Sequence, residues 1–317
     1  MSFLVGWLMI WACGNPEPPT AAAGIDDVSR TSPDPLSWSI DERGPFQIGY
    51  LSWDHRYLLS EALGERSIRI HLWYPTEETT GPAGMYTVGT DPDVIADATL
   101  APPVYTEGYP VHVHSHGDLH LGTGSAFLAR HFASHGWVSV GMDHTGNTLL
   151  DLSSDPSAAN FFHRPLDVRA ALDAVEAHAM LDGQADTRKS ILSGHSRGAY
   201  TTWASLGAEF DLDSVEQMCA TGEGIDGDGC SADELAMFHG DLSDSRVVAT
   251  IPLDGTIRRQ WFGVAGEATV QGPILYFSPT DSGGSQAQFD ALADIDFRWV
   301  RIDDACHQTF ATGECPD

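Results

Sequence analysis

The sequence contains few basic residues. Its 317 residues include 16 lysines and arginines against 45 aspartates and glutamates, for a formal net charge of −29, and Lys189 is the only lysine. A surface so rich in negative charge repels phosphate backbones and anionic lipid headgroups. We therefore expect no nucleic-acid partner.

The apolar run at the start of the chain, from Phe3 to Ala12, is too short to span a bilayer as a mature helix. It lacks the usual basic flank but is otherwise typical of an export signal, so we predict a signal peptide over residues 1–12. Cys13 and the Pro- and Ala-rich stretch after it resemble a bacterial lipoprotein signal. We expect an exported protein with a disordered tether over residues 13–45 and a lipid anchor at Cys13, in the periplasm or at the cell surface. An ordinary signal peptide, with secretion, or a short buried segment is the alternative.

Cysteine is scarce as well. Apart from Cys13, the chain holds four cysteines in two sequence-local pairs, and neither pair has the C-x-x-C spacing of a zinc knuckle. In an exported protein such cysteines are expected to be oxidised. We predict disulfides between Cys219 and Cys230 and between Cys306 and Cys315.

From about residue 46 to residue 317, short apolar runs alternate with helix-like segments. This alternation predicts an α/β fold with a mostly parallel central sheet and helices on both faces. Ser125 is the expected N-cap of one helix, and Pro165 the expected first residue of another. The expected strands cover residues 67–75, 110–117, 137–144, 190–193, 246–255, 272–281 and 296–305.

An insertion at about residues 210–245 interrupts this alternation. Asp226 and Asp228 within it are similar to part of a calcium-binding loop, but the residues after Gly229 do not complete the EF-hand spacing. A solvated acidic loop closed by a disulfide is the favoured interpretation.

The stretch VHVHSHGDLH, residues 111–120, is similar to the H-x-H-x-D-H motif of metallo-hydrolases. Its candidate ligands are His112, His114, His116 and Asp118. However, Leu119 stands where the last histidine of that motif belongs, and no matching ligand set follows downstream. A metal-dependent hydrolase built on these three histidines remains an alternative, and we expect no metal or other cofactor.

The segment GHSRG, residues 194–198, matches G-x-S-x-G between an expected strand and an expected helix. In that context the motif forms a strained turn that presents a nucleophilic serine, and its two glycines leave room for the turn. We predict that Ser196 is the nucleophile of a hydrolase.

A serine nucleophile needs a base, a carboxylate that orients the base, and an oxyanion hole. In this fold the acid and then the histidine follow the serine along the chain. His239 lies in the insertion, so His307, just after the last expected strand, is the predicted base. Asp254 and Asp281 both end a strand, and position alone leaves the acid open between them. The backbone N–H groups of Arg197 and Asp118 are the expected oxyanion donors. Gly117 would then let the backbone turn towards the oxyanion, and this role for the segment weakens the metal interpretation.

The chain resembles the plasma-type platelet-activating factor acetylhydrolases and the bacterial proteins known as predicted dienelactone hydrolases, a branch of the α/β-hydrolase superfamily. The resemblance spans residues 70–310 and rests on IHLWYPT, HSHG, FLARHFASHGWVSVGMDHTGN, RPLDVRAALDAV, GHSRG, PLDGT and CHQTF.

This resemblance implies a metal-independent esterase with a Ser-Asp-His triad, acting on a small-molecule or lipid-like ester. PLDGT resembles the acid-bearing segment of the acetylhydrolases and favours Asp254 over Asp281. Asp118 and Arg197 depart from the family pattern, and both departures would alter the rim of the pocket. A non-catalytic binding protein that kept the fold is a further alternative.

Overall fold

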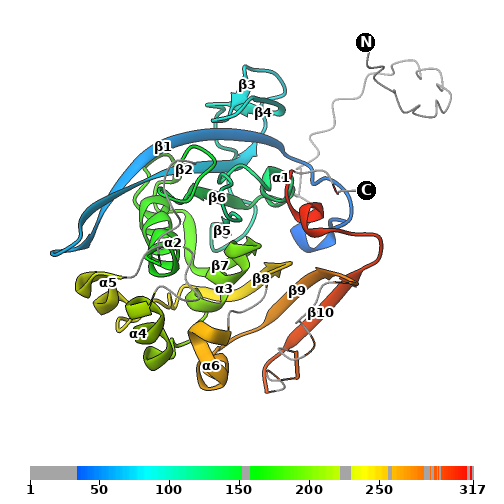
Figure 1. Ribbon diagram of the computed structural model, residues 1–317. Helices are drawn as coiled ribbons and strands as arrows, with labels where there is room; N and C mark the ends of the chain where they lie inside the picture. Colours follow the sequence, from blue (N-terminus) through cyan, green and yellow to red (C-terminus); the bar gives the residue numbers. More distant parts are fainter. Residues whose placement is uncertain are drawn as a thin grey trace, which may run out of the picture. The chain divides into compact units, whose positions relative to one another are not determined.

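A computed structural model describes residues 34–151, 158–221, 230–255, 259–281, 286, 289–290, 292, 294–312 and 315 (Figure 1). The expected signal peptide, the anchor at Cys13 and the acidic residues Asp226 and Asp228 lie outside the described residues. Within the described residues, no helix combines the length and the apolar character needed to cross a membrane.

A ten-stranded sheet forms the centre of the protein, in the order β10-β9-β8-β7-β5-β6-β2-β1-β4-β3. The strands from β5 to β10 pair in parallel, whereas β2 is antiparallel to both β6 and β1. The bounds are β1 Gln47–Ser60, β2 Gly64–Thr76, β3 Ala83–Met85, β4 Thr90–Ala96, β5 Tyr109–Ser115, β6 Val138–Asp143, β7 Ala185–His195, β8 Val247–Leu253, β9 Ile274–Pro279 and β10 Phe297–Ile302.

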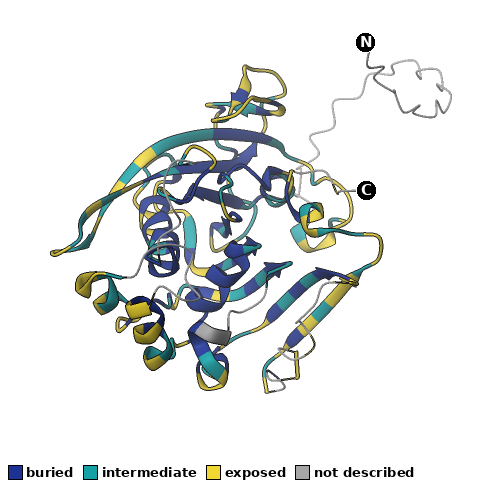
Figure 2. Cartoon of the chain, viewed as in Figure 1, coloured by how far each residue is buried: buried dark blue, intermediate teal, exposed yellow. Residues whose placement is uncertain are grey.

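Each strand predicted from the sequence is present. β7 begins at Ala185 rather than Ser190, and β1, β3 and β4 were not anticipated. The central strands β5 and β6 are buried along almost their whole length (Figure 2). Both faces of these strands are covered, so even their polar side chains, such as His112, His114 and Ser139, are buried.

Helices cover both faces of the sheet. α1 (Ala126–Ser134) packs its small residues Ala126, Ala129 and Ala133 against one face, in a cluster that includes Trp73 of β2. α2 (Asn160–Glu176) and α3 (Arg197–Ser205) belong to the larger core on the other face, with Leu72 of β2. Adjacent residues of one strand thus enter opposite cores, as the alternation of side chains along a strand requires.

The remaining helices are short. They are η1 Pro35–Ser37, η2 Ala179–Leu181, α4 Leu212–Thr221, α5 Ala232–Met237, α6 Arg259–Glu267 and η3 His307–Phe310.

The start of α2 differs from the prediction. The helix begins at Asn160, so Pro165 lies inside it rather than at its first position. A proline has no N–H to donate to the carbonyl four residues earlier, which here belongs to Phe161. The hydroxyl of Tyr200 on α3 donates to that carbonyl instead, at 2.9 Å. A tertiary hydrogen bond therefore satisfies the helix where the sequence breaks its ladder.

The described part of the predicted tether contacts α1. Residues from Asp34 onward belong to one compact unit. The N–H groups of Gly44 and Phe46 bond to Ser134, and the ring of Trp38 lies 6.0 Å from that of Phe46. Residues 34–45 thus reach the folded unit earlier along the chain than we expected.

Both predicted disulfides are present. In the insertion, Cys219 of α4 pairs with Cys230, just before α5, with an S–S distance of 2.00 Å. After β10, Cys306 pairs with Cys315 at 2.07 Å and encloses η3. The second bridge therefore closes the segment that carries His307.

Candidate active site

Four loops meet where the parallel strands end. Asp118, Ser196, Asp254 and His307 follow β5, β7, β8 and β10 respectively. The carboxyl ends of parallel strands share one edge of a sheet, so the topology brings these loops together (Figure 1). The chain leaves β5 for β6 on one side and returns to β7 on the other, which makes a switch point where α/β proteins commonly bind ligands.

Ser196 occupies a strained turn between β7 and α3. Its φ of 54° and ψ of −114° lie in a region that non-glycine residues rarely adopt. A Cβ atom on Gly194 would collide with the carbonyl of Gly198, and one on Gly198 would collide with the carbonyl of Ser115. The N–H of Ser196 donates to the carbonyl of Leu253 at 2.9 Å, which ties the turn to β8. The steric demand predicted for the two glycines is confirmed.

His307 contacts Asp254. The ring Nδ1 lies 2.6 Å from Oδ2 of the carboxylate, and the Asp254 side chain is 8% exposed whereas that of His307 is 46% exposed. A carboxylate only accepts hydrogen bonds, so Nδ1 carries a proton, and in the neutral ring the lone pair is therefore on Nε2. Asp281, the other candidate acid, lies exposed just after β9.

His195 is a site residue that the sequence reasoning missed. Its Nε2 donates to the backbone carbonyl of His307 at 2.9 Å, and the two rings lie 4.6 Å apart. Burial, and then the neighbouring ring of His307, lowers the pKa of His195 to about 4, so His195 is neutral at neutral pH where it contacts His307. Its position inside G-x-S-x-G gave no signal of this contact.

The loop after β5 lies directly against the serine turn. A Cβ atom on Gly117 would be 3.4 Å from Cβ of Ser196 and 3.1 Å from Nδ1 of His195. Only a residue without a side chain allows this approach without displacing a neighbour.

Asp118 and Arg197, the two residues that differ from the pattern of the proteins that the sequence resembles, are partners. Nε of Arg197 lies 2.9 Å from Oδ1 of Asp118, with the arginine 6% and the aspartate 37% exposed. The Arg197 guanidinium also lies 5.3 Å from the centre of the Phe161 ring. The two departures therefore form one feature, an ion pair that links the β5 loop to the start of α3.

The histidines of the opening motif serve the fold. His112 bonds through Nδ1 to Ser139 and through Nε2 to Ser193, at 2.7 and 2.8 Å. His114 also contacts Ser193 and is almost fully buried. His116 accepts from the N–H of His144 at Nε2, so its Nδ1 is the protonated nitrogen.

These contacts bear on the metal hypothesis. Both ring nitrogens of His112 and of His116 already make hydrogen bonds. The described residues contain no group of three or more side chains arranged to hold a metal ion. The geometry thus gives a metal centre at this cluster no support.

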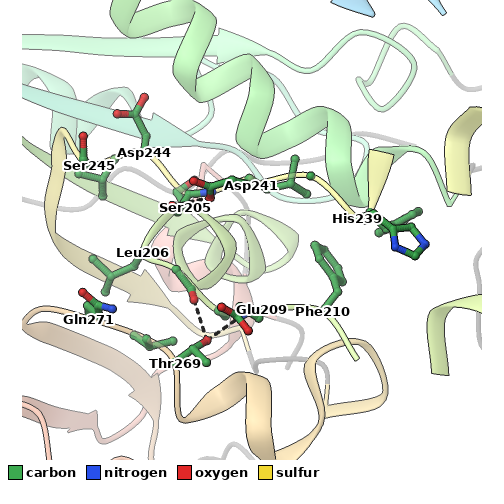
Figure 3. Close-up of a pocket in the computed structure, with 18 of the residues that line it drawn as sticks. Ser205, Leu206, Glu209, Phe210, His239, Asp241, Asp244, Ser245, Thr269 and Gln271 are labelled. Atoms are coloured by element: carbon green, nitrogen blue, oxygen red, sulfur yellow. Dashed lines mark hydrogen bonds between the residues drawn. The ribbon is translucent and has the colours of Figure 1, made fainter. Parts of the chain in front are cut away.

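A separate cavity of about 880 Å³ lies at the other edge of the sheet (Figure 3). Its walls come from residues between Ser205 and Leu212, between Phe238 and Val247, and between Ala268 and Gln271. These segments follow α3 or precede β8 and β9. The cavity is therefore built on the amino ends of the strands, away from the loops that hold Ser196 and His307.

Two comparisons of the sequence with known proteins find no match. No family model matches the chain. No curated protein matches it either.

Solved structures do match. The chain is similar to the ferulic acid esterase from Streptomyces cinnamoneus, at 22% identity over 85% of this chain and 77% of that one, with a TM-score of 0.56. Similarity at this level of identity shows the fold, and the predicted α/β-hydrolase fold is confirmed. The resemblance to the acetylhydrolase and dienelactone hydrolase branch stays a prediction.

Proposed function

We propose that the protein is a serine carboxylic ester hydrolase. Ser196 is the nucleophile, His307 the general base, Asp254 the orienting acid, and the N–H groups of Asp118 and Arg197 form the oxyanion hole. The observation that carries the proposal is the 2.6 Å contact between His307 and Asp254, at the edge of the sheet where Ser196 sits in its strained turn.

The proposed reaction follows from the protonation of His307. Asp254 holds the proton of His307 on Nδ1, so Nε2 takes the proton of Ser196 as the serine oxygen attacks the ester carbonyl. The C–O bond to the alcohol then breaks, and His307 passes the proton to the leaving oxygen. Water, deprotonated by the same nitrogen, attacks the acyl-enzyme, which releases the acid and restores Ser196.

Two features support the oxyanion hole. Arg197 is the first residue of α3, so its N–H lies among the backbone groups at the positive end of the helix. Such groups stabilise negative charge at a helix start. Gly117 brings the β5 loop within van der Waals reach of Ser196, and Asp118 is the next residue of this loop.

For the substrate we propose a neutral ester. The net charge of −29 opposes the approach of anionic substrates. The structural neighbour is named for ferulic acid esters, and the resemblance in the sequence implies acetyl or lipid-like esters. A screen should therefore compare methyl ferulate, p-nitrophenyl esters of graded chain length, phospholipids with a short sn-2 chain, and polyester film.

We also propose that the protein works outside the cytoplasm. Its two disulfides are typical of proteins from oxidising compartments. Lipidation of Cys13, which lies outside the described residues, is the finer proposal. Mass spectrometry of the N-terminal peptide from membranes would show a diacylglyceryl group on Cys13 if the proposal holds, and an unmodified or absent peptide if it does not.

A fluorophosphonate probe tests the proposed mechanism, because it reacts covalently only with an activated serine. We expect one modified peptide, the one that contains Ser196, and a loss of ester hydrolysis in proportion to the labelling. A chelator should leave the activity unchanged. Hydrolysis that persists after complete labelling would exclude Ser196 as the nucleophile, and labelling without any hydrolysis across the ester screen would favour a non-catalytic protein.

A further inference from the structure

A buried arginine lies behind the proposed oxyanion hole. Arg164, in the first turns of α2, is fully buried. Burial, and the nearby charge of Arg197, lower its pKa to about 9, which still leaves it protonated at neutral pH. A buried cation is expensive unless its hydrogen bonds are satisfied. Its partners therefore indicate what the charge is used for.

Two of those partners are backbone carbonyls of the β5 loop. Nη1 of Arg164 donates to the carbonyl of His116 at 2.6 Å, and Nη2 donates to the carbonyl of Gly117 at 3.1 Å. Nη1 also lies 3.4 Å from the hydroxyl of Ser115. One guanidinium thus holds two successive carbonyls of the loop that lies against Ser196.

Because the peptide bond is planar, fixing the carbonyl of a peptide also fixes the direction of its N–H. The carbonyl of Gly117 and the N–H of Asp118 belong to one trans peptide and point in opposite directions. With the carbonyl fixed on Arg164, the N–H of Asp118 must point away from the Arg164 guanidinium. The protonated Nδ1 of His116 donates to the same carbonyl at 2.6 Å, which restricts the peptide further.

The second oxyanion residue is connected to the same arginine. Asn147 accepts from Nη2 of Arg164 through its oxygen, at 2.5 Å, and donates to Oδ1 of Asp118 through its nitrogen, at 2.6 Å. The same Oδ1 contacts Nε of Arg197 at 2.9 Å. A chain of four side chains therefore runs from Arg164 to both residues whose N–H groups would bind the oxyanion.

We propose that Arg164 is a positioning residue for ester hydrolysis: it orients the Gly117–Asp118 peptide and, through Asn147, the Asp118–Arg197 pair that together form the oxyanion hole. The inference rests on the proposed function. A cation on the carbonyl side of a peptide polarises its N–H, and the effect is strong where water is excluded. The N–H groups would then face the developing oxyanion already oriented, which is where such donors contribute most.

The chain offers a matched control on the same helix. Arg169 of α2 also donates to two backbone carbonyls, those of Asp241 and Ser243, at 2.9 and 2.6 Å. These carbonyls belong to the loop before β8, at the cavity edge of the sheet. Replacing Arg169 removes a guanidinium with a similar bonding pattern and leaves the β5 loop intact.

The experiment compares Arg164→Met with Arg169→Met in the full-length protein, with p-nitrophenyl acetate as substrate. Loss of a whole oxyanion donor costs about 10²–10³ in kcat, so loss of its positioning residue should lower kcat by roughly 10- to 100-fold with KM changed by less than about threefold. Arg169→Met should keep kcat within about threefold of wild type even if its Tm falls.

Three further variants cover the case in which Arg164→Met does not fold. Arg164→Lys, which keeps the charge and can reach one carbonyl, should show an intermediate kcat. Guanidinium ion, below concentrations that unfold the protein, should restore part of the kcat of Arg164→Ala and none in Arg169→Ala. Wild-type kcat in folded Arg164 variants, or an equal loss in both series, would overturn the proposal. Activity that survives in Ser196→Ala would instead overturn the proposed function itself.

Discussion

The two edges of the central sheet differ in how their polar groups are used. At the carboxyl ends of the strands, buried side chains fix backbone groups: Arg164 holds the β5 loop, and His195 holds the carbonyl of His307. At the amino ends, the loops leave a cavity of about 880 Å³. This cavity is thus not where the proposed reactive groups converge, so the candidate active site is identified by its preorganised polar groups and not by its volume.

The helix α2 serves both edges. Arg164, near its start, is fully buried, whereas Arg169, one and a half turns later, is only partly buried. Both donate to pairs of backbone carbonyls. Two arginines with a similar bonding pattern therefore differ in their proposed roles: Arg164 supports catalysis at one edge, and Arg169 supports the structure at the other.

The largest expected difference between the two edges is the one between Ser196, in the turn before α3, and Ser205, at the end of α3. Ser196→Ala should reduce ester hydrolysis by on the order of 10⁶-fold, because the nucleophile is removed. Ser205→Ala, at the end of α3 where it lines the cavity, should leave kcat within about threefold of wild type. Steady-state kinetics with p-nitrophenyl acetate measures both. Similar losses in the two variants would mean that the cavity edge takes part in the reaction.

The acid is the next test. Asp254→Asn should lower kcat by roughly 10⁴-fold, because an amide no longer holds His307 in the tautomer that accepts the serine proton. Asp281→Asn, one strand farther along the sheet, should keep most of the activity. Circular dichroism and Tm establish that both variants are folded. The reverse ranking would transfer the role to Asp281, and His307 would then have to move from its observed contact.

Much of this edge could be predicted from local patterns. The turn at Ser196 has a signature that is complete within five residues, and the strands before it and after it are apolar and β-rich. His307 could be chosen because few histidines follow the serine and the fold constrains their order. Strand β1 was missed because Asp54, His55 and Arg56 interrupt its apolar pattern on an exposed stretch.

The supporting residues could not be predicted, since their contacts join distant segments. Arg164 meets Gly117, 47 positions away, and His195 meets His307, 112 positions away. Pro165 led the prediction to place the helix start too late, because the hydrogen bond from Tyr200 that compensates for it exists only in the folded protein. The choice between Asp254 and Asp281 likewise depended on which loop lies beside His307.

Acid should destabilise the protein through the buried histidines of this edge. Burial lowers the pKa of His195 and of His144 to about 4 in the folded state, against about 6.5 in the unfolded chain. The unfolded state therefore binds more protons between these values, and stability must fall as the pH drops from 6.5 to 4, by about 3 kcal/mol for each group.

Urea unfolding at several pH values measures this slope. In His144→Asn the slope should be shallower by about one proton, because one buried titrating group is gone. The carboxylate of Asp167, whose pKa is lowered by Arg66 despite its burial, contributes mainly below pH 4 and adds little to the slope in this range. Constant stability between pH 6.5 and 4 would contradict the expectation.

The two disulfides offer the finest comparison. Their sequence separations, 9 and 11 residues, are nearly equal, so opening either one should destabilise the protein by a similar amount, about 2–3 kcal/mol in the chain-entropy model. Only Cys306–Cys315 encloses η3, which carries His307. The Cys306→Ser/Cys315→Ser variant should therefore also lose activity.

This loss should be small, because other contacts still hold η3. Ser125 donates to the carbonyl of Phe310 at 2.9 Å, and the N–H of Thr312 donates to Gly124 at 2.9 Å. We expect kcat to fall by roughly fivefold, the effect of misplacing a base without removing it, whereas the Cys219→Ser/Cys230→Ser variant should keep the wild-type kcat per folded molecule. Calorimetry and kinetics at a temperature where both variants are folded make the comparison. Equal kcat values in the two variants would show that the hydrogen bonds to Phe310 and Thr312 position His307 without the disulfide.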